Sequence, residues 1–226
     1  MKIGLSIDFD FFCREKQDWD WIHPLHKESY TTWLLRYLNI DLQKECDPHK
    51  YADFNPVNMK SILSENGFDF SESQYGVADN HVYAHSFFCH DKQIKTIINF
   101  DAHHDCWPIY KNKIDCSSWL TSLKNVKAVS VYPKWKDPYA DSEPDRDVKI
   151  IKWKDFKNEK HKYKVLKTFI CRSSPWVPPH LDSLFLKFVD SFTKYPLISY
   201  EKIVLRNQTA LQQISKIRNK ELTNAR

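Results

Sequence analysis

The chain has 226 residues, of which 42% are hydrophobic and 28% are charged, and its formal net charge is +5. These values are typical of a soluble globular protein, and the length suits one domain with a full core better than two. Only three glycines are present, with no G-x-G-x-x-G sequence and no phosphate-binding loop, which excludes the usual dinucleotide and nucleoside triphosphate chemistries.

The sequence gives no indication of export, a membrane span or nucleic-acid binding. No apolar run approaches the length of a membrane span, and Asp8 and Asp10 interrupt the first apolar stretch, unlike in a signal peptide. The six cysteines form no C-x-x-C pair, so we expect free thiols in a cytoplasmic protein. From Tyr200 onward there are six Lys or Arg and two Glu without a nucleic-acid motif, which favours a solvated helical face.

The first predicted element in chain order is a strand over residues 2–7, which leads into Asp8 and Asp10. Because side chains alternate along a strand, these two carboxylates are expected on the same side of the sheet.

A helix is predicted from about Glu28 to Tyr37. Glu28 falls in its first turn, where an acid also interacts favourably with the helix dipole.

Two further helices are predicted before the middle of the chain. Asn55-Pro56 is an N-cap and first-turn signal for a helix that ends near Glu65. The next helix is predicted to begin at Asp79-Asn80-His81. A histidine at a helix start within a site is a candidate ligand, whereas a lone one more often caps or packs.

The most informative stretch is Asp101-Ala102-His103-His104-Asp105, which follows an apolar, β-branched run over 94–98. This pattern is typical of a buried parallel strand, and open α/β sheets bind ligands at the carboxyl ends of such strands. Alternating Asp, His and Asp offer oxygen and imidazole ligands that suit manganese, zinc or iron better than calcium or magnesium. The alternative is a strand end with solvated carboxylates and a capping histidine.

The rest of the chain continues the α/β pattern. The predicted elements are a helix over 115–123, strands over 126–131, 148–151 and 168–171, and a helix over 181–192. A polar loop over 133–147 is a candidate lid, and residues 172–176 form another strand end that is expected to face the site. The remainder is expected to be helical and polar. No repeat or linker divides the chain, so a single domain over 1–226 is expected.

Four carboxylates come together if the two acidic strand ends meet in one cleft: Asp8, Asp10, Asp101 and Asp105. Two carboxylates about 4 Å apart repel by roughly 4 kcal/mol at an effective dielectric of about 20, so four cannot stay ionised together without cations. Two divalent ions would neutralise the cluster, with His81 and His103 completing the coordination. Bound metals lower the pKa of water from about 15.7 towards about 7, so the cluster predicts a hydrolase with a metal-activated water.

The motifs resemble those of a known superfamily. Residues 101–105 resemble the Asp-Ala-His-x-Asp motif of the ureohydrolases, the arginases and agmatinases, and residues 6–10 resemble that family's Ser-x-Asp-x-Asp motif. Asp79-Asn80-His81 resembles its histidine-bearing loop. The resemblance implies a three-layer arginase-like α/β fold with a mostly parallel sheet. Asp-x-Asp is the last motif in typical arginases but the first here, and a circular permutation of the sheet would account for that order.

The resemblance also implies a ligand set for two divalent ions, most simply Mn²⁺: Asp8, Asp10, His81, Asp101, His103 and Asp105. Asp8 and Asp101 would each bridge both ions. His81 and Asp105 would complete one coordination shell, and the remaining histidine and aspartate would complete the other.

Two further residues are candidates for catalysis. In the ureohydrolases a glutamate near the start of the helix after the Asp-x-Asp strand holds the guanidinium, and Glu28 is the match, with Glu45, Asp47 and Asp53 as the next to test. His104 would point away from the metals if its stretch is a strand. In a loop it could reach the cleft as a proton shuttle.

The compact, rearranged motif order is similar to that of the peptide arginases, which convert arginine in ribosomally made precursor peptides to ornithine and urea. The family's Gly-Gly-Asp-His loop is reduced here to residues 78–81, which argues against free arginine as the substrate. The resemblance therefore implies natural-product biosynthesis on an arginine-containing precursor peptide.

Three other functions fit parts of the sequence. A phosphatase could use Asp8 and Asp10, but Phe12 stands where such enzymes have Thr, and residues 101–105 would then have no role. A one-zinc deacetylase of arginase-like fold would not use the full ligand set. A precursor-peptide-binding protein with structural metals is the non-enzymatic alternative.

Overall fold

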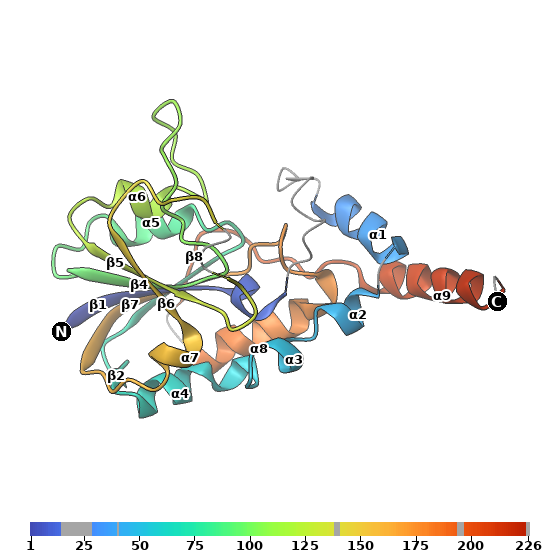
Figure 1. Ribbon diagram of the computed structural model, residues 1–226, viewed down its shortest axis with the longest axis horizontal. Helices are drawn as coiled ribbons and strands as arrows, with labels where there is room; N and C mark the ends of the chain where they lie inside the picture. The colour runs from blue at the N-terminus through green and yellow to red at the C-terminus, as the bar shows by residue number, and fades with distance from the viewer. Residues whose placement is uncertain (15–28, 40, 138–140, 194–196, 225–226) are drawn as a thin grey trace.

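The computed structural model describes residues 1–14, 29–39, 41–137, 141–193 and 197–224 (Figure 1). A central sheet of eight strands carries helices on both faces, which makes a three-layer α/β fold. The strand order is β6-β5-β4-β1-β7-β3-β8, with β2 beside β7, and every pairing among these described strands is parallel. The predicted α/β class with a mostly parallel sheet is therefore confirmed.

The described strands are β1 (Lys2–Asp8), β2 (Phe68–Asp69), β3 (Gln74–Ala78), β4 (Thr96–Phe100), β5 (Lys127–Tyr132), β6 (Val148–Lys152), β7 (Tyr163–Cys171) and β8 (Leu197–Ser199). The described α-helices are α1 (Ser29–Asn39), α2 (Leu42–Glu45), α3 (Pro48–Tyr51), α4 (Met59–Glu65), α5 (Tyr83–Phe88), α6 (Trp119–Ser122), α7 (Trp153–Phe156), α8 (Asp182–Phe192) and α9 (Gln208–Asn224). Single 3₁₀ turns occur at Phe9–Phe12, Pro56–Asn58 and Pro179–Leu181. None of the described helices has the length and apolar character needed to cross a membrane.

The five predicted strands are present as β1, β4, β5, β6 and β7, but β2, β3 and β8 were not predicted. Gly76 lies at the middle of β3 and weakens its strand signal. It is needed there because a Cβ at this position would lie 3.0 Å from the Phe87 ring of α5. The segment that contains β8 was expected to be helical, which is wrong for its first residues. Three exposed residues are too few to show a strand period.

The helix predicted to begin at Asp79 begins instead at Tyr83. Residues 79–82 form a turn, in which the Asn80 side chain accepts a hydrogen bond from the backbone N–H of Val82. Asp and Asn favour such side-chain-to-backbone bonds over a helix. His81 therefore lies on a turn at the carboxyl end of β3.

The core is divided by the sheet into two layers. On one face the alternate residues of β1, Ile3, Leu5 and Ile7, are fully buried with the aromatic side chains of α7 and α8. On the other face α5 and α6 pack over β4 and β7, with Phe88 and Trp119 in that cluster. Both faces of the central strands are therefore covered, as a parallel sheet requires.

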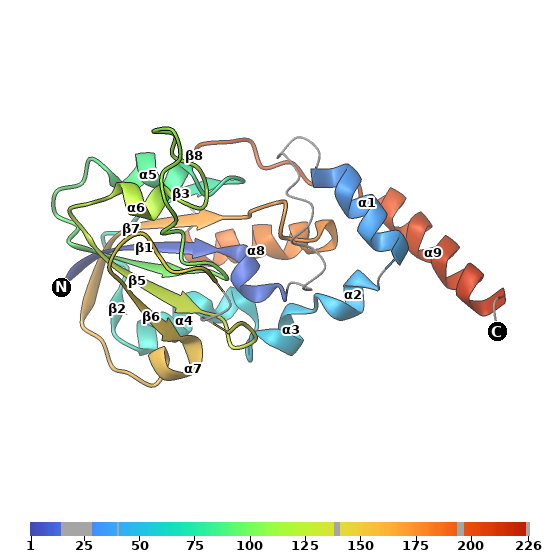
Figure 2. The same ribbon diagram turned by 45° about the horizontal axis from the view of Figure 1, so that its top comes forward.

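A third cluster lies beyond the carboxyl ends of the strands, where α1 packs against α9 (Figures 1 and 2). Trp33 and Tyr37 of α1 are buried there with Leu211 of α9. The Trp33 indole N–H donates to the Ser174 carbonyl at 2.7 Å. This bond attaches the helix pair to the loop that follows β7.

Candidate metal centre

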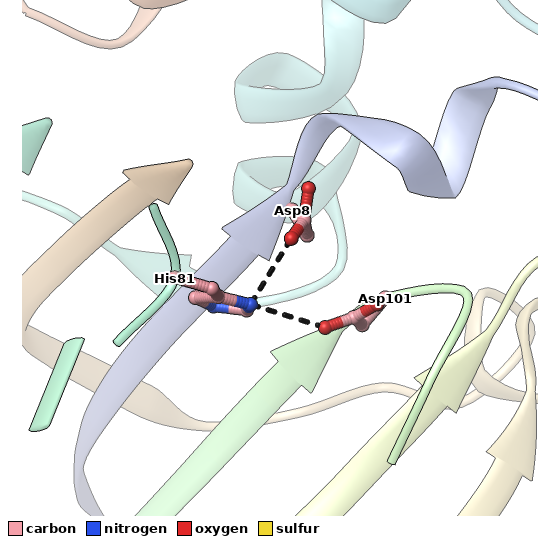
Figure 3. Close-up of side chains that lie close together, drawn as sticks. All are labelled: Asp8, His81 and Asp101. Carbon is pink, nitrogen blue, oxygen red and sulfur yellow. Dashed lines mark ion pairs between the residues drawn. The ribbon is translucent and has the colours of Figure 1, made fainter. Parts of the chain in front are cut away.

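The candidate site lies where β1 and its neighbours end. β1 lies between β4 and β7, and β3 is on the far side of β7. Asp8 ends β1, Asp101 follows β4, and the turn after β3 carries His81, so three chain segments bring their side chains to one point (Figure 3). Such strand ends, where the order of connections changes direction, are the usual ligand-binding position of open parallel sheets.

His81 is at the centre of the deeper half of the site. Its Nδ1 atom lies 3.1 Å from Oδ2 of Asp8, 3.3 Å from Oδ2 of Asp101 and 2.9 Å from Oδ2 of Asp105. All four side chains are buried. Asp8, His81 and Asp101 offer ligand atoms that all lie within 4.8 Å of one another, so they could hold a metal ion.

His103 is at the centre of the outer half. Its Nδ1 atom lies 3.4 Å from Oδ2 of Asp10 and 3.5 Å from Oδ1 of Asp101. These three residues form the second group that could hold a metal ion. The His103 side chain is 21% exposed, whereas those of Asp10 and Asp101 are each 1% exposed, so solvent reaches the site from the His103 side.

Asp101 connects the two halves. One of its carboxylate oxygens faces His81 and the other faces His103. The backbone N–H of His103 donates to Oδ1 at 2.8 Å, and the Asn99 amide donates to Oδ2 at 3.1 Å, so the carboxylate is held in this orientation. The structure therefore brings together all six residues that the sequence predicted as ligands.

The His81 ring is held in its orientation by contacts on the side away from the carboxylates. Its Nε2 atom lies 2.7 Å from the Ser6 hydroxyl, and Ser6 is on the same face of β1 as Asp8. The ring lies parallel to that of Phe169, within 3°, and its centroid is 5.0 Å from that of Trp119. With Nε2–H donating to Ser6, the lone pair on Nδ1 faces the carboxylates, which is the orientation a metal ligand needs.

Trp119 and Ser173 also hold the carboxylates, although the sequence did not mark either as an individual site residue. The Trp119 indole N–H donates to Oδ2 of Asp105 at 2.6 Å, and the Ser173 hydroxyl donates to Oδ2 of Asp8. Ser173 lies in the strand end over 172–176 that was expected to face the site, and this contact confirms that position. Trp119 belongs to a separate helix, so no local pattern could have indicated it.

The buried carboxylates lie so close together that most of their pKa values are raised. Burial, with the neighbouring carboxylates, raises the pKa of Asp8 and Asp10, and burial with the Asp101 charge raises that of Asp105 to about 7. Burial alone would lower the pKa of His81, but the carboxylates around it outweigh burial and raise it. Burial alone would raise the pKa of Asp101, but its contacts with both histidines outweigh burial, and the pKa of Asp101 is lowered. Without cations the cluster must retain protons.

A metal ion fits this donor set. Among the described residues, Oδ2 of Asp10 is buried and accepts no hydrogen bond, which is costly for a carboxylate oxygen. A cation between Asp10, Asp101 and His103 would satisfy it. Carboxylate oxygens with imidazole nitrogens are donors that first-row divalent metals accept. The buried Asp and His groups could therefore hold a metal ion.

The two candidates for catalysis have different outcomes. Glu28 lies outside the described residues, so its role stays a prediction. His104 is buried, and its Nδ1 accepts a hydrogen bond from the backbone N–H of Cys106 at 2.9 Å. Its Nε2 lies 2.6 Å from the Trp107 indole nitrogen and 3.0 Å from the Ser142 carbonyl oxygen. These contacts favour a structural role in joining two loops over the proton shuttle.

Comparisons with protein-family models, with curated proteins and with solved structures give no match.

We expect a chelated, metal-free sample to lose stability as the pH rises from 6 to 8, and Mn²⁺ to restore it. The Asp105 pKa of about 7 in the folded state exceeds its ordinary value of 3.8, and the His81 pKa is also raised. The folded protein therefore binds more protons than the unfolded chain in this range, and its stability falls as those protons leave. Metal ligands must be deprotonated, so Mn²⁺ should stabilise more at pH 8.

Thermal unfolding midpoints with and without Mn²⁺ at the two pH values test this expectation. At a concentration of 100 Kd the ion should add about 2.7 kcal/mol to the free energy of unfolding. Equal Mn²⁺-induced shifts at pH 6 and pH 8 would contradict the assignment of these groups as ligands.

We also expect Ser6→Ala to weaken metal binding by about 10- to 100-fold, because His81 loses the acceptor that orients its ring. Ser130→Ala is the matched control. Ser130 is a fully buried serine on β5 that donates to the His104 carbonyl instead. Titration with Mn²⁺ measures both variants, and equal affinities would show that the Ser6 hydroxyl does not position His81.

Proposed function

We propose that the protein is a dinuclear-metal hydrolase that cleaves the guanidinium group of arginine side chains in a peptide to give ornithine and urea. The observation that carries the proposal is the position of Asp101, with one oxygen towards His81 and the other towards His103. A carboxylate so placed suits a bridge between two cations. The match between this arrangement and the ureohydrolase-like motifs supports this reaction class.

The charge balance supports two ions rather than one. Four buried carboxylates carry four negative charges when ionised, and two divalent cations offset them. The mixture of oxygen and imidazole donors suits manganese, zinc or iron, and the resemblance to the ureohydrolases makes Mn²⁺ the first choice. Bound at these ligands, the ions would supply Lewis acidity and an activated water near neutral pH.

The chain's own residues would determine how the substrate enters. The His81 half is closed by the rings of Trp119 and Phe169, whereas His103 is partly exposed, so the guanidinium would enter from the His103 side. The Trp176 ring lies 5.5 Å from that of His103 and lines this entrance. Glu28 is proposed to hold the planar guanidinium through paired hydrogen bonds, which fixes its carbon for attack.

A ribosomally made precursor peptide with arginine residues, acted on in the cytoplasm, is the proposed partner. Access past the partly exposed His103 suits a side chain whose reacting group lies at the end of a flexible arm, as that of arginine does.

The phosphatase alternative is less well supported by the packing. Phe12, which stands at the position where such phosphatases have Thr, is fully buried among Phe9, Phe11 and Phe188. It belongs to the core and offers no polar group to a phosphate. The non-catalytic alternative would show the same metal content as the enzyme but no urea release.

We expect two Mn²⁺ ions per chain by elemental analysis, and close to none in Asp101→Ala because that carboxylate contacts both halves. Asp69→Ala is the control, since Asp69 is an exposed carboxylate on β2 that accepts from the backbone N–H of Ser71. A single ion in the parent protein, or an unaffected pair in Asp101→Ala, would contradict the dinuclear proposal.

We expect the Mn²⁺-loaded protein to release urea from arginyl peptides, with each modified residue losing the mass of one cyanamide unit. Glu28→Gln should retain both ions, but its turnover should fall at least about 100-fold, because a neutral amide cannot balance the positive charge of the guanidinium. Glu72→Gln, which alters a carboxylate paired with Lys164 at 2.5 Å, should turn over like the parent.

Mass spectrometry of the peptides and a urea assay measure both variants. Near-parental turnover by Glu28→Gln would exclude Glu28 and direct attention to Glu45 and Asp47. Asp53 is a weaker candidate because it already pairs with Lys134 and Lys157. A preference for free arginine over every arginyl peptide would overturn the peptide assignment and leave the metal assignment standing.

A further inference from the structure

The segment between β8, at one edge of the sheet, and α9 runs from the sheet to the α1–α9 helix pair (Figure 2). The backbone N–H of Tyr200 donates to the Val77 carbonyl at 3.0 Å, which continues the pairing of β8 with β3. The Tyr200 ring stacks on that of Tyr83, at 5.6 Å between centroids, on the first residue of α5. The segment therefore contacts both ends of the turn that carries His81.

Within this segment, Glu201 hydrogen-bonds directly to that turn. Its Oε2 atom accepts hydrogen bonds from the backbone N–H groups of Asp79 and Asn80, at 3.0 and 2.9 Å. These are the two residues immediately before His81. A carboxylate that accepts two backbone N–H groups forms charge-assisted bonds, which are stronger than neutral ones.

A buried ionic network supports the same turn from the other side. Nε of Arg172 donates to Oδ1 of Asp79 at 2.7 Å, and Nη1 of Arg172 donates to the Val204 carbonyl at 2.9 Å. Arg206 in turn pairs with Asp182 at the start of α8. The segment 200–206 is therefore anchored to α8 as well as to the His81 turn.

We propose that Glu201 is a positioning residue that holds the His81 turn in its metal-binding position, so that the segment 200–206 sets the metal affinity of the deeper half of the site. The inference rests on the proposed dinuclear function. The regular hydrogen bonds of β3 end at Ala78 and α5 begins only at Tyr83, so side-chain contacts hold the residues between them. Of these contacts among the described residues, only those of Glu201 bind the backbone N–H groups of both residues that precede His81.

Loss of the Glu201 carboxylate should loosen the turn without unfolding the protein. Asp79 and Asn80 are only half-buried, so water can replace the missing acceptor. Glu201 itself belongs to none of the three hydrophobic clusters. The His103 half is built from β1 and the loop after β4, whereas the Glu201 carboxylate bonds to the His81 turn. Arg206, at the far end of the segment, donates instead to the Ser174 and Val177 carbonyls of the loop after β7.

The test compares Glu201→Ala with Lys202→Ala, an exposed neighbour, by Mn²⁺ titration and by amide exchange in the metal-free state. We expect Glu201→Ala to bind one of its two ions about 10- to 100-fold more weakly and the other as the parent does. Glu201→Gln retains an acceptor oxygen and should fall between, and Lys202→Ala should match the parent. The Asp79 and Asn80 amides should exchange at least about 10-fold faster in Glu201→Ala, with β1 amides unchanged.

The results distinguish a positioning role of Glu201 from a general structural role. A general structural role would lower the unfolding midpoint of metal-free Glu201→Ala and weaken both ions equally, which would overturn the inference. Unchanged exchange at Asp79 and Asn80 would also overturn it. If the parent itself binds fewer than two ions, the dinuclear function fails, and the positioning of the turn by Glu201 is then judged by the exchange rates alone.

Discussion

The structure depends on a concentration of negative charge that its own side chains cannot balance. Four carboxylates are buried around two imidazoles, and even fully protonated imidazoles would leave the ionised cluster negative. Burial of charge is tolerated only where it is paired or where it coordinates a cation. Burial and neighbouring charges raise the pKa values of Asp8, Asp10 and Asp105, and Oδ2 of Asp10 accepts no hydrogen bond although it is buried. A pair of divalent ions would supply the missing positive charge and a partner for that oxygen.

The parallel sheet makes this concentration possible. The central strand β1 has neighbours on both sides, so the residues that follow β4 and β3 reach Asp8 from opposite directions. Outer contacts from Ser6, Trp119 and Ser173 then orient the ligands before any ion binds. Preorganisation of this kind matters because binding energy is not spent on ordering the site. The segment 200–206 extends the same support to the turn that strand pairing leaves unheld.

Much of the fold and most of the candidate ligands could be predicted from local sequence. The apolar run before Asp101 and the alternating carboxylates of 8–10 each identify a strand end without knowledge of the rest of the chain. What could not be predicted depends on long-range contacts. β3 was not predicted because Gly76, which packs closely against the Phe87 ring, weakens the strand pattern. Trp119 and Glu201 could not be predicted because they reach the site from distant segments of the chain. The role of His104 could not be predicted even though it lies within a recognised motif. Its contacts with Trp107 and Ser142 depend on the conformation of loops, which a strand pattern does not describe.

The central claim is that the two histidine-centred groups are two halves of one metal centre joined by Asp101. The most direct test is anomalous X-ray diffraction, at the manganese absorption edge, from crystals grown with Mn²⁺. We expect two anomalous peaks, one between Asp101 and His81 and one between Asp101 and His103. One peak alone, or peaks away from Asp101, would contradict the central claim.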